Sequence, residues 1–141
     1  MGIEEQLLAV TPLDGRYATK VDQLRAIVSE FGLMKRRVAV ETGWLATLGS
    51  GILPDVVPLG DVSRARLEDL AADFSIQDAM RIKEIEDTTD HDVKALEYWM
   101  REEFAGHETM QSYIELTHFG LTSEDPTNLS YAMMLRDVRD E

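Results

Sequence analysis

Two short segments combine histidine, hydroxyl and charged side chains where helices are expected to begin. They are T-T-D-H-D-V-K-A at residues 88–95 and H-F-G-L-T-S-E-D at residues 118–125. The first turn of a helix carries free backbone N–H groups and the positive end of the helix dipole, and both favour bound anions. Two such starts in one chain indicate a site for an anionic small molecule.

In the first segment, His91 follows the expected helix cap Thr89 by two residues, and Lys94 lies one turn further on. Both side chains can approach the free N–H groups and together could hold a phosphate or carboxylate. Alternatively, Asp90 and Asp92 simply suit the helix dipole, and His91 is a capping or surface histidine. Spacing alone favours this alternative, because one histidine among acidic residues is a weak signal. A helical zinc pair is absent, since no second histidine lies four residues away.

The second segment places two adjacent hydroxyl groups, Thr122 and Ser123, at another expected helix start. Such a pair can bind a carboxylate through several hydrogen bonds, although spacing alone favours an ordinary N-cap. Glu124 and Asp125 oppose anion binding unless they point away. His118 precedes Thr122 by one turn and faces either the same site or the core.

Arg16 and Tyr17 form a third candidate, directly after the turn sequence P-L-D-G. A guanidinium and a phenol on a fixed turn can clamp a phosphate; the alternative is a surface arginine and a core tyrosine. The basic run at residues 35–37 is interpreted as a solvated helix face. No catalytic triad, P-loop, dinucleotide loop or metal cluster is present in the sequence, so these residues alone predict anion binding without a reaction.

Apolar residues recur at helical spacing along most of the chain, without a useful alternating strand pattern. The expected fold is therefore all-α. Ser75 with Asp78 and Thr122 with Asp125 are spaced like capping boxes, and an N-cap at Asp125 would put Pro126 at the first helical position. The apolar patterns predict a long helix over about 24–48, with Glu41 interrupting its stripe, and further helices over about 61–74, 76–87, 93–105, 110–119 and 126–138.

Composition restricts the possible partners. The chain has 141 residues, a formal net charge of −13 and no cysteine. Such an acidic surface disfavours nucleic acid and anionic membranes, so an anionic ligand requires a few basic residues focused in one cleft. The acidic N-terminus does not resemble a signal peptide and no apolar run is long enough to span a membrane, which predicts a cytoplasmic protein. The last helical pattern has no stop signal, which predicts a fragment of a longer chain.

Three segments together resemble the adenylosuccinate lyase family, a branch of the fumarase/aspartase superfamily. They are P-L-D-G-R-Y at 12–17, I-E-D-T-T-D-H-D-V-K-A-L-E-Y at 85–98 and H-F-G-L-T-S-E-D-P-T-N-L-S at 118–130. Their order and spacing match the N-terminal third of that family, and the resemblance covers essentially the whole chain. It implies an N-terminal helical domain over residues 1–110 and the start of a central helical bundle over residues 111–141.

The resemblance also implies a reaction. The family eliminates fumarate from adenylosuccinate, giving AMP, and from the related succinyl-carboxamide ribotide, without a metal or organic cofactor. A base removes a proton next to a carboxylate, and an acid protonates the leaving nitrogen. Enzymes of this family are homotetramers whose active sites combine segments of three subunits. Their acid histidine and base-bearing serine loop match nothing here, so no catalytic residue is expected and the fragment alone should be inactive.

Residue by residue, the resemblance implies only substrate-binding roles. Asp90 stands where the family has asparagine, and its extra charge either weakens binding or caps the helix. The family roles fall on Arg16 and Tyr17 at the nucleotide phosphate, on Asp90, His91 and Asp92 with Lys94 beside them, on Thr122 and Ser123 at the succinyl group, and on His118 near the site.

Two alternatives remain beside this interpretation. One is another lyase of the superfamily, acting on argininosuccinate or aspartate, and the segments D-G-R-Y and T-T-x-H-D-V-K-A argue against it. The other is a self-contained helical interaction module without enzymatic activity, against which the unterminated last helix argues.

Overall fold

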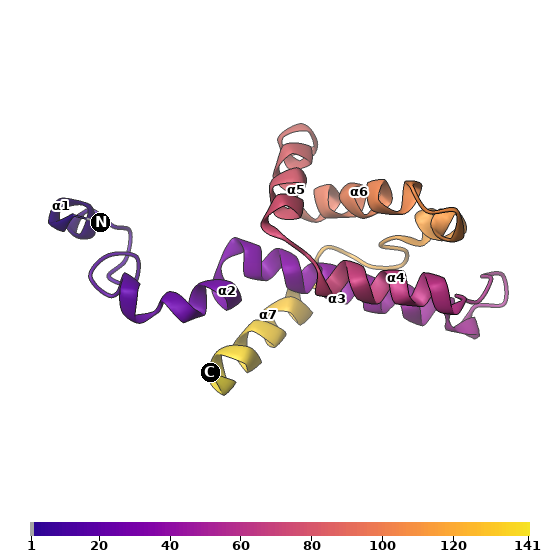
Figure 1. Cartoon of the computed structure of the whole chain (residues 1–141), viewed down its shortest axis with the longest axis horizontal. Coiled ribbons are helices and arrows are strands. Elements are labelled where there is room, and N and C mark those ends of the chain that lie inside the picture. Colours follow the sequence, from indigo (N-terminus) through magenta and orange to yellow (C-terminus); the bar gives the residue numbers. More distant parts are fainter. Residues whose placement is uncertain (1) are drawn as a thin grey trace.

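The computed structural model describes residues 2–141, which contain helices and no strand (Figure 1). This confirms the all-α expectation. The α-helices are α1 Ile3–Leu7, α2 Arg25–Val28, α3 Glu30–Thr47, α4 Asp61–Ala72, α5 Ile76–Thr89, α6 Asp92–Ala105 and α7 Glu124–Asp140. Short 3-10 segments are η1 Ala18–Lys20, η2 Asp22–Leu24 and η4 Glu108–Leu116, and η3 Leu48–Ile52 is a π-helical turn.

The long helix expected over residues 24–48 is divided at Ser29. The backbone of Ser29 is extended, and its side chain accepts a hydrogen bond of 3.2 Å from the Gly32 N–H, so Ser29 caps α3. A serine hydroxyl stabilises a new helix start by this bond, which explains why the apolar stripe continues while the helix does not. At the other end, Gly51 lies within η3 and has φ 91°, a left-handed conformation that glycine adopts readily and that interrupts the helical backbone.

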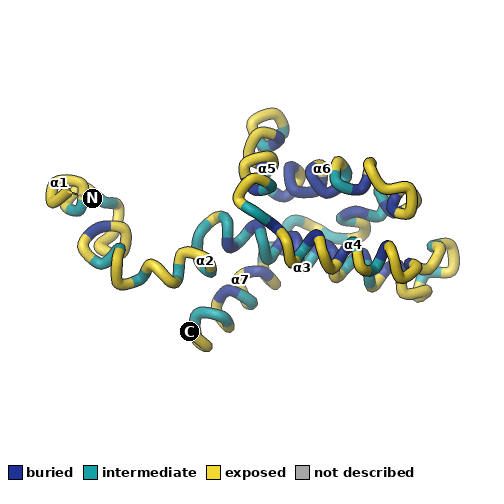
Figure 2. Tube along the Cα trace, viewed as in Figure 1, coloured by how far each residue is buried: buried dark blue, intermediate teal, exposed yellow. Residues whose placement is uncertain are grey.

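The hydrophobic core lies where α3, α4, α5 and α6 meet, and η4 closes it. Figure 2 shows the buried residues concentrated on these elements. Ile82 and Phe104 are fully buried, and Trp99 packs edge-on against Phe74 with 5.3 Å between ring centroids. The α5 start follows the prediction, because the Ser75 side chain accepts from the Asp78 N–H while the Asp78 carboxylate accepts from the Ser75 N–H.

The segment before α7 differs from the expected short α-helix over residues 110–119. It is the 3-10 segment η4, which ends at Leu116, and turns at residues 117–123 follow it. His118 has φ 61° and Gly120 has φ 73°, both left-handed. These two conformations reverse the chain and direct α7 against α3.

The N-terminal segment, residues 2–24, extends away from the helical body (Figure 1). Ile3 and Leu7 on α1 are each 79% exposed. At the opposite end of the sequence, α7 packs on α3 but leaves Leu129 and Leu135 exposed to solvent. None of the described helices is both long and apolar enough to cross a membrane.

Candidate functional site

The corner between α5 and α6 sets the first half of the site. Asp90 takes a left-handed conformation with φ 49° and closes α5 through its backbone N–H, which donates to Glu86 O at 2.8 Å. Short polar residues tolerate this conformation better than most, which suits aspartate or asparagine here. Thr89 is the last residue of α5, so the expectation that Thr89 caps α6 is wrong. The cap is His91, whose Nδ1 accepts from the Lys94 N–H at 3.2 Å.

His91 joins the two helix starts. Because its Nδ1 accepts the Lys94 N–H, the proton of the neutral ring lies on Nε2. Nε2 is 3.4 Å from the Ser123 hydroxyl oxygen at the start of α7. The ring therefore donates to that oxygen and leaves the Ser123 hydroxyl proton free for another acceptor. His91 is thus both a cap, as spacing favoured, and a link between the two segments.

Asp92 is engaged by the protein itself. Its Oδ1 accepts from the Val93 N–H at 2.8 Å, and its Oδ2 accepts from Arg37 Nη1 at 2.6 Å. Partial burial favours the neutral acid, but the Arg37 and Val93 hydrogen bonds outweigh it and hold the pKa of Asp92 below its usual value. The carboxylate therefore remains charged and anchors the first turn of α6 to α3.

Arg37 corrects the expectation that residues 35–37 form a solvated face. Arg37 is only 6% exposed, and its Nη2 donates to the Thr127 hydroxyl at 3.0 Å in the first turn of α7. Arg36 is also paired, since its Nη2 lies 2.6 Å from Asp137 Oδ2. Both arginines were missed as structural residues, although position 37 shares a helical face with the buried Met34.

Lys94 projects beside the same helix start, but its ammonium has protein partners. Its Nζ lies 2.7 Å from Glu97 Oε2 and 5.1 Å from the centre of the Tyr98 ring. Glu97 is buried and also pairs with Arg101 at 3.1 Å. Lys94 and His91 are therefore not arranged in advance to bind one anion together.

Thr122 and Ser123 have different roles at the start of α7. The Thr122 N–H and hydroxyl both donate to Asp125 Oδ2, at 2.7 and 3.0 Å. These two bonds lower the pKa of Asp125. The helix begins at Glu124 with Ser123 as its N-cap residue, and the Ser123 hydroxyl makes no cap bond. The expectation of an N-cap at Asp125 is wrong, and Pro126 is the third helical residue rather than the first.

His118 lies near this start, but its ring is turned inward. Its Nδ1 is 2.6 Å from Glu41 Oε1, and Glu41 is only 2% exposed. Burial raises the pKa of Glu41, and the His118 hydrogen bond offsets part of that rise. Glu41 interrupts the apolar stripe of α3 because its carboxyl group forms a buried pair with the His118 imidazole in the turn before α7.

Arg16 and Tyr17 do not lie near the starts of α6 and α7. Both belong to the extended N-terminal segment, where the Arg16 guanidinium stacks 4.6 Å from the centre of the Tyr17 ring. Figure 1 shows that segment leading away from α6 and α7. The remaining predicted residues thus gather at two adjoining helix starts, and the Arg16–Tyr17 pair stands apart.

Other features of the described residues do not add to the site. An open groove of about 520 Å³ lies between α3 and α7, beside Trp44, Leu129 and Met133. Its lining contains no basic residue and does not include His91 or Ser123, so it does not suit an anion. Within residues 2–141, no group of three or more histidine, cysteine or acidic side chains is arranged to hold a metal ion.

Comparison with known proteins gives one consistent result. The chain is 52% identical over 136 residues to the adenylosuccinate lyase of Haemophilus influenzae, 47% identical to that of Escherichia coli K12 and 46% identical to that of Vibrio cholerae. These alignments cover 95–96% of this chain. The chain spans about 30% of the length of each relative. No family model matches the chain.

Proposed function

We propose that this chain, a homologue of the N-terminal portion of adenylosuccinate lyases, forms the part of such an enzyme that binds the succinylated nucleotide. The full-length protein would release fumarate from adenylosuccinate and from the succinyl-carboxamide ribotide in purine synthesis. The acid and base that break the C–N bond would come from sequence outside these residues.

One observation carries the proposal: His91 and Ser123, on two different helix starts, meet at 3.4 Å. The Nε2–H of His91 donates to Ser123, so the Ser123 hydroxyl is directed to donate to a carboxylate of the succinyl group. Proton loss next to that carboxylate adds negative charge to it in the transition state. A donor held in place before the reaction stabilises that charge without reorganising.

The remaining candidates take supporting roles in this proposal. Asp90 and Asp92 shape and anchor the start of α6, and Thr122 fixes the start of α7 through Asp125. Lys94 would contribute a positive charge at the edge of the site. The His118 ring, turned inward and held by Glu41, would support the turn before α7 rather than contact the substrate.

Arg16 and Tyr17 would bind the nucleotide phosphate in a site completed by other subunits. Their distance from α6 in this chain agrees with a site assembled from several segments (Figure 1). The proposed assembly is a homotetramer in the cytoplasm. Residues 1–110 would form its N-terminal domain, and residues 111–141 would begin the central bundle, where the exposed Leu129 and Leu135 would be covered.

The first prediction concerns the chain alone. The purified 141-residue protein should show no fumarate release from adenylosuccinate, whereas the protein read from the same genomic frame beyond Glu141 should be active. The measurement is the rate of fumarate formation by both proteins, with adenylosuccinate, argininosuccinate and aspartate tested separately. Turnover by the short chain would refute the assignment of the acid and base elsewhere, and preference for either of the other two substrates would refute the proposed specificity.

The second prediction concerns Asp90, which directly precedes His91 in the chain. Asp90→Asn in the full-length protein should lower KM for adenylosuccinate by about two- to fivefold, because it removes a like charge near the substrate. Asparagine adopts the left-handed conformation readily, so Tm should not fall. The effect should weaken at high salt; an unchanged KM at low salt would show that the Asp90 charge does not reach the substrate.

A further inference from the structure

We propose that Arg37 is a positioning residue, which sets the distance between His91 and Ser123 by holding the starts of α6 and α7 with one guanidinium. This inference rests on the proposed function and adds to it a residue outside the binding set. Arg37 comes from α3, in the middle of the longest helix, and contacts neither proposed donor directly.

The contacts of Arg37 reach both halves of the site. Nη1 lies 2.6 Å from Asp92, which directly follows His91, and Nη2 lies 3.0 Å from the Thr127 hydroxyl. Thr127 is one helical turn beyond Ser123, and its N–H donates to Ser123 O at 3.3 Å. One intervening residue therefore separates the guanidinium from each residue that carries a proposed donor.

The chemistry of arginine suits this task. The guanidinium is planar and its nitrogens are held in fixed geometry, so two acceptors bound to Nη1 and Nη2 have a fixed separation. Arg37 is only 6% exposed, which restricts the movement of its side chain. A lysine at this position could bind Asp92 or Thr127 but could not fix both.

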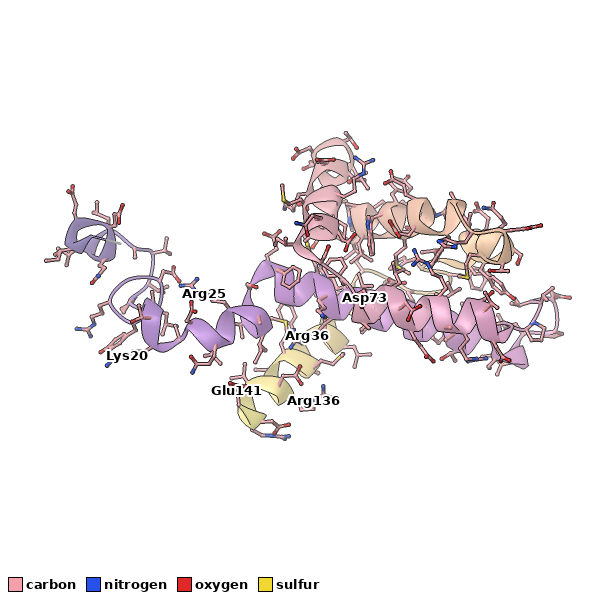
Figure 3. All side chains as sticks on the ribbon, in the orientation of Figure 1. Lys20, Arg25, Arg36, Asp73, Arg136 and Glu141 are labelled. Atoms are coloured by element: carbon pink, nitrogen blue, oxygen red, sulfur yellow. The ribbon has the colours of Figure 1, made fainter. Side chains whose placement is uncertain are left out.

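Arg36 provides a matched comparison on the same helix. It also joins α3 to α7, through Asp137 at 2.6 Å, but this contact lies near the far end of α7 from Ser123. Figure 3 shows Arg36 directed toward α7. Loss of the Arg36 pair should loosen the packing of α7 without moving its first turn. A variant that lacks this pair therefore shows what general support of α7 contributes, apart from positioning of the site.

The test is a set of double-mutant cycles in the full-length enzyme. Thr127→Val removes the hydroxyl acceptor and keeps the side-chain shape, and it should lower kcat/KM about tenfold, because small displacements of a donor cost rate steeply. In a Ser123→Ala background the same change should cost less than about threefold, since the group being positioned is gone. Arg37→Lys should resemble Thr127→Val, and combining the two should add little.

Asp137→Asn is the control, and its effect on kcat/KM should be small and equal with and without Ser123. The Tm of every variant should be measured, because a lost activity with an unchanged Tm reports a misaligned site rather than an unfolded protein. If Thr127→Val lowers kcat/KM by the same factor in both backgrounds, Arg37 only supports the fold and the positioning role is wrong. If Ser123→Ala itself retains full activity, the proposed binding role of Ser123 fails. This outcome differs from equal effects of Thr127→Val in both backgrounds, which would contradict only the positioning role of Arg37.

Discussion

Replacing His91 by asparagine in the full-length protein is expected to lower kcat/KM by about ten- to a hundredfold with little change in Tm. The asparagine Oδ1 can take the place of Nδ1 and accept the Lys94 N–H that His91 now caps at 3.2 Å. It has no counterpart of Nε2, so the link to Ser123 is lost. The Ser123 hydroxyl is then no longer directed at the substrate carboxylate. A hydrogen bond to such a charged group is worth about 1.5–3 kcal/mol, which corresponds to that loss in rate.

Ser123→Ala should produce a loss of similar size by removing the other half of the link. Because the Ser123 hydroxyl makes no cap bond, this change should not weaken α7. Ser75→Ala is the opposite control: Ser75 caps α5 away from the site, so its loss should cost about 1 kcal/mol of stability and leave kcat unchanged. If the His91→Asn variant and the Ser123→Ala variant both show wild-type kinetics, neither residue belongs to the binding site.

Local signals in the sequence placed the starts of α5, α6 and α7 to within two or three residues, because caps depend on residues three or four positions apart. The Ser75–Asp78 box formed as expected, and the second segment begins a helix at Glu124. The first start is displaced by two residues because an imidazole nitrogen can accept a backbone N–H as an aspartate oxygen does. His91 therefore takes the cap in place of Thr89.

The contacts that assemble the site are long-range, and periodicity does not identify the two partners in each of them. Arg37 binds residues 55 and 90 positions further along the chain, and Glu41 binds one 77 positions further along. A usable signal existed: positions 37 and 41 lie on the buried face of their helix, together with Met34, Val38 and Leu45. A charged residue on such a face requires a charged or hydrogen-bonding partner, because an unpaired charge is costly there.

The Arg16–Tyr17 pair illustrates a different limit. The turn sequence before it predicted its local form, and the chain does turn there, with the Gly15 N–H bonded to Thr11 O at 3.2 Å. In the proposed assembly, its relation to the rest of the site would depend on contacts that the N-terminal segment makes with other subunits. Neither spacing nor the fold of residues 2–141 determines such contacts.

Replacing Glu41 by alanine is expected to reduce stability by about 2–4 kcal/mol. The change leaves His118 Nδ1 without its partner at 2.6 Å and opens a cavity at a site that is 2% exposed. Glu41→Gln retains the shape and an oxygen that can accept the Nδ1–H, so it should be far less damaging. Tm for the three proteins at pH 7 makes this comparison, and equal losses for alanine and glutamine would show that the charge itself is required.

The dependence on pH gives the sharper test of this pair. Burial raises the pKa of Glu41 above its usual 4.5, so the folded protein holds the carboxyl proton more tightly than the unfolded chain does. The stability that this proton contributes is fully present below pH 4.5 and is lost as the pH rises through the folded pKa. Glutamine does not titrate, so the Tm of Glu41→Gln relative to the parent should rise across that range and then level off. A relative Tm that falls instead would mean that the ion pair with His118 outweighs burial and lowers the pKa of Glu41.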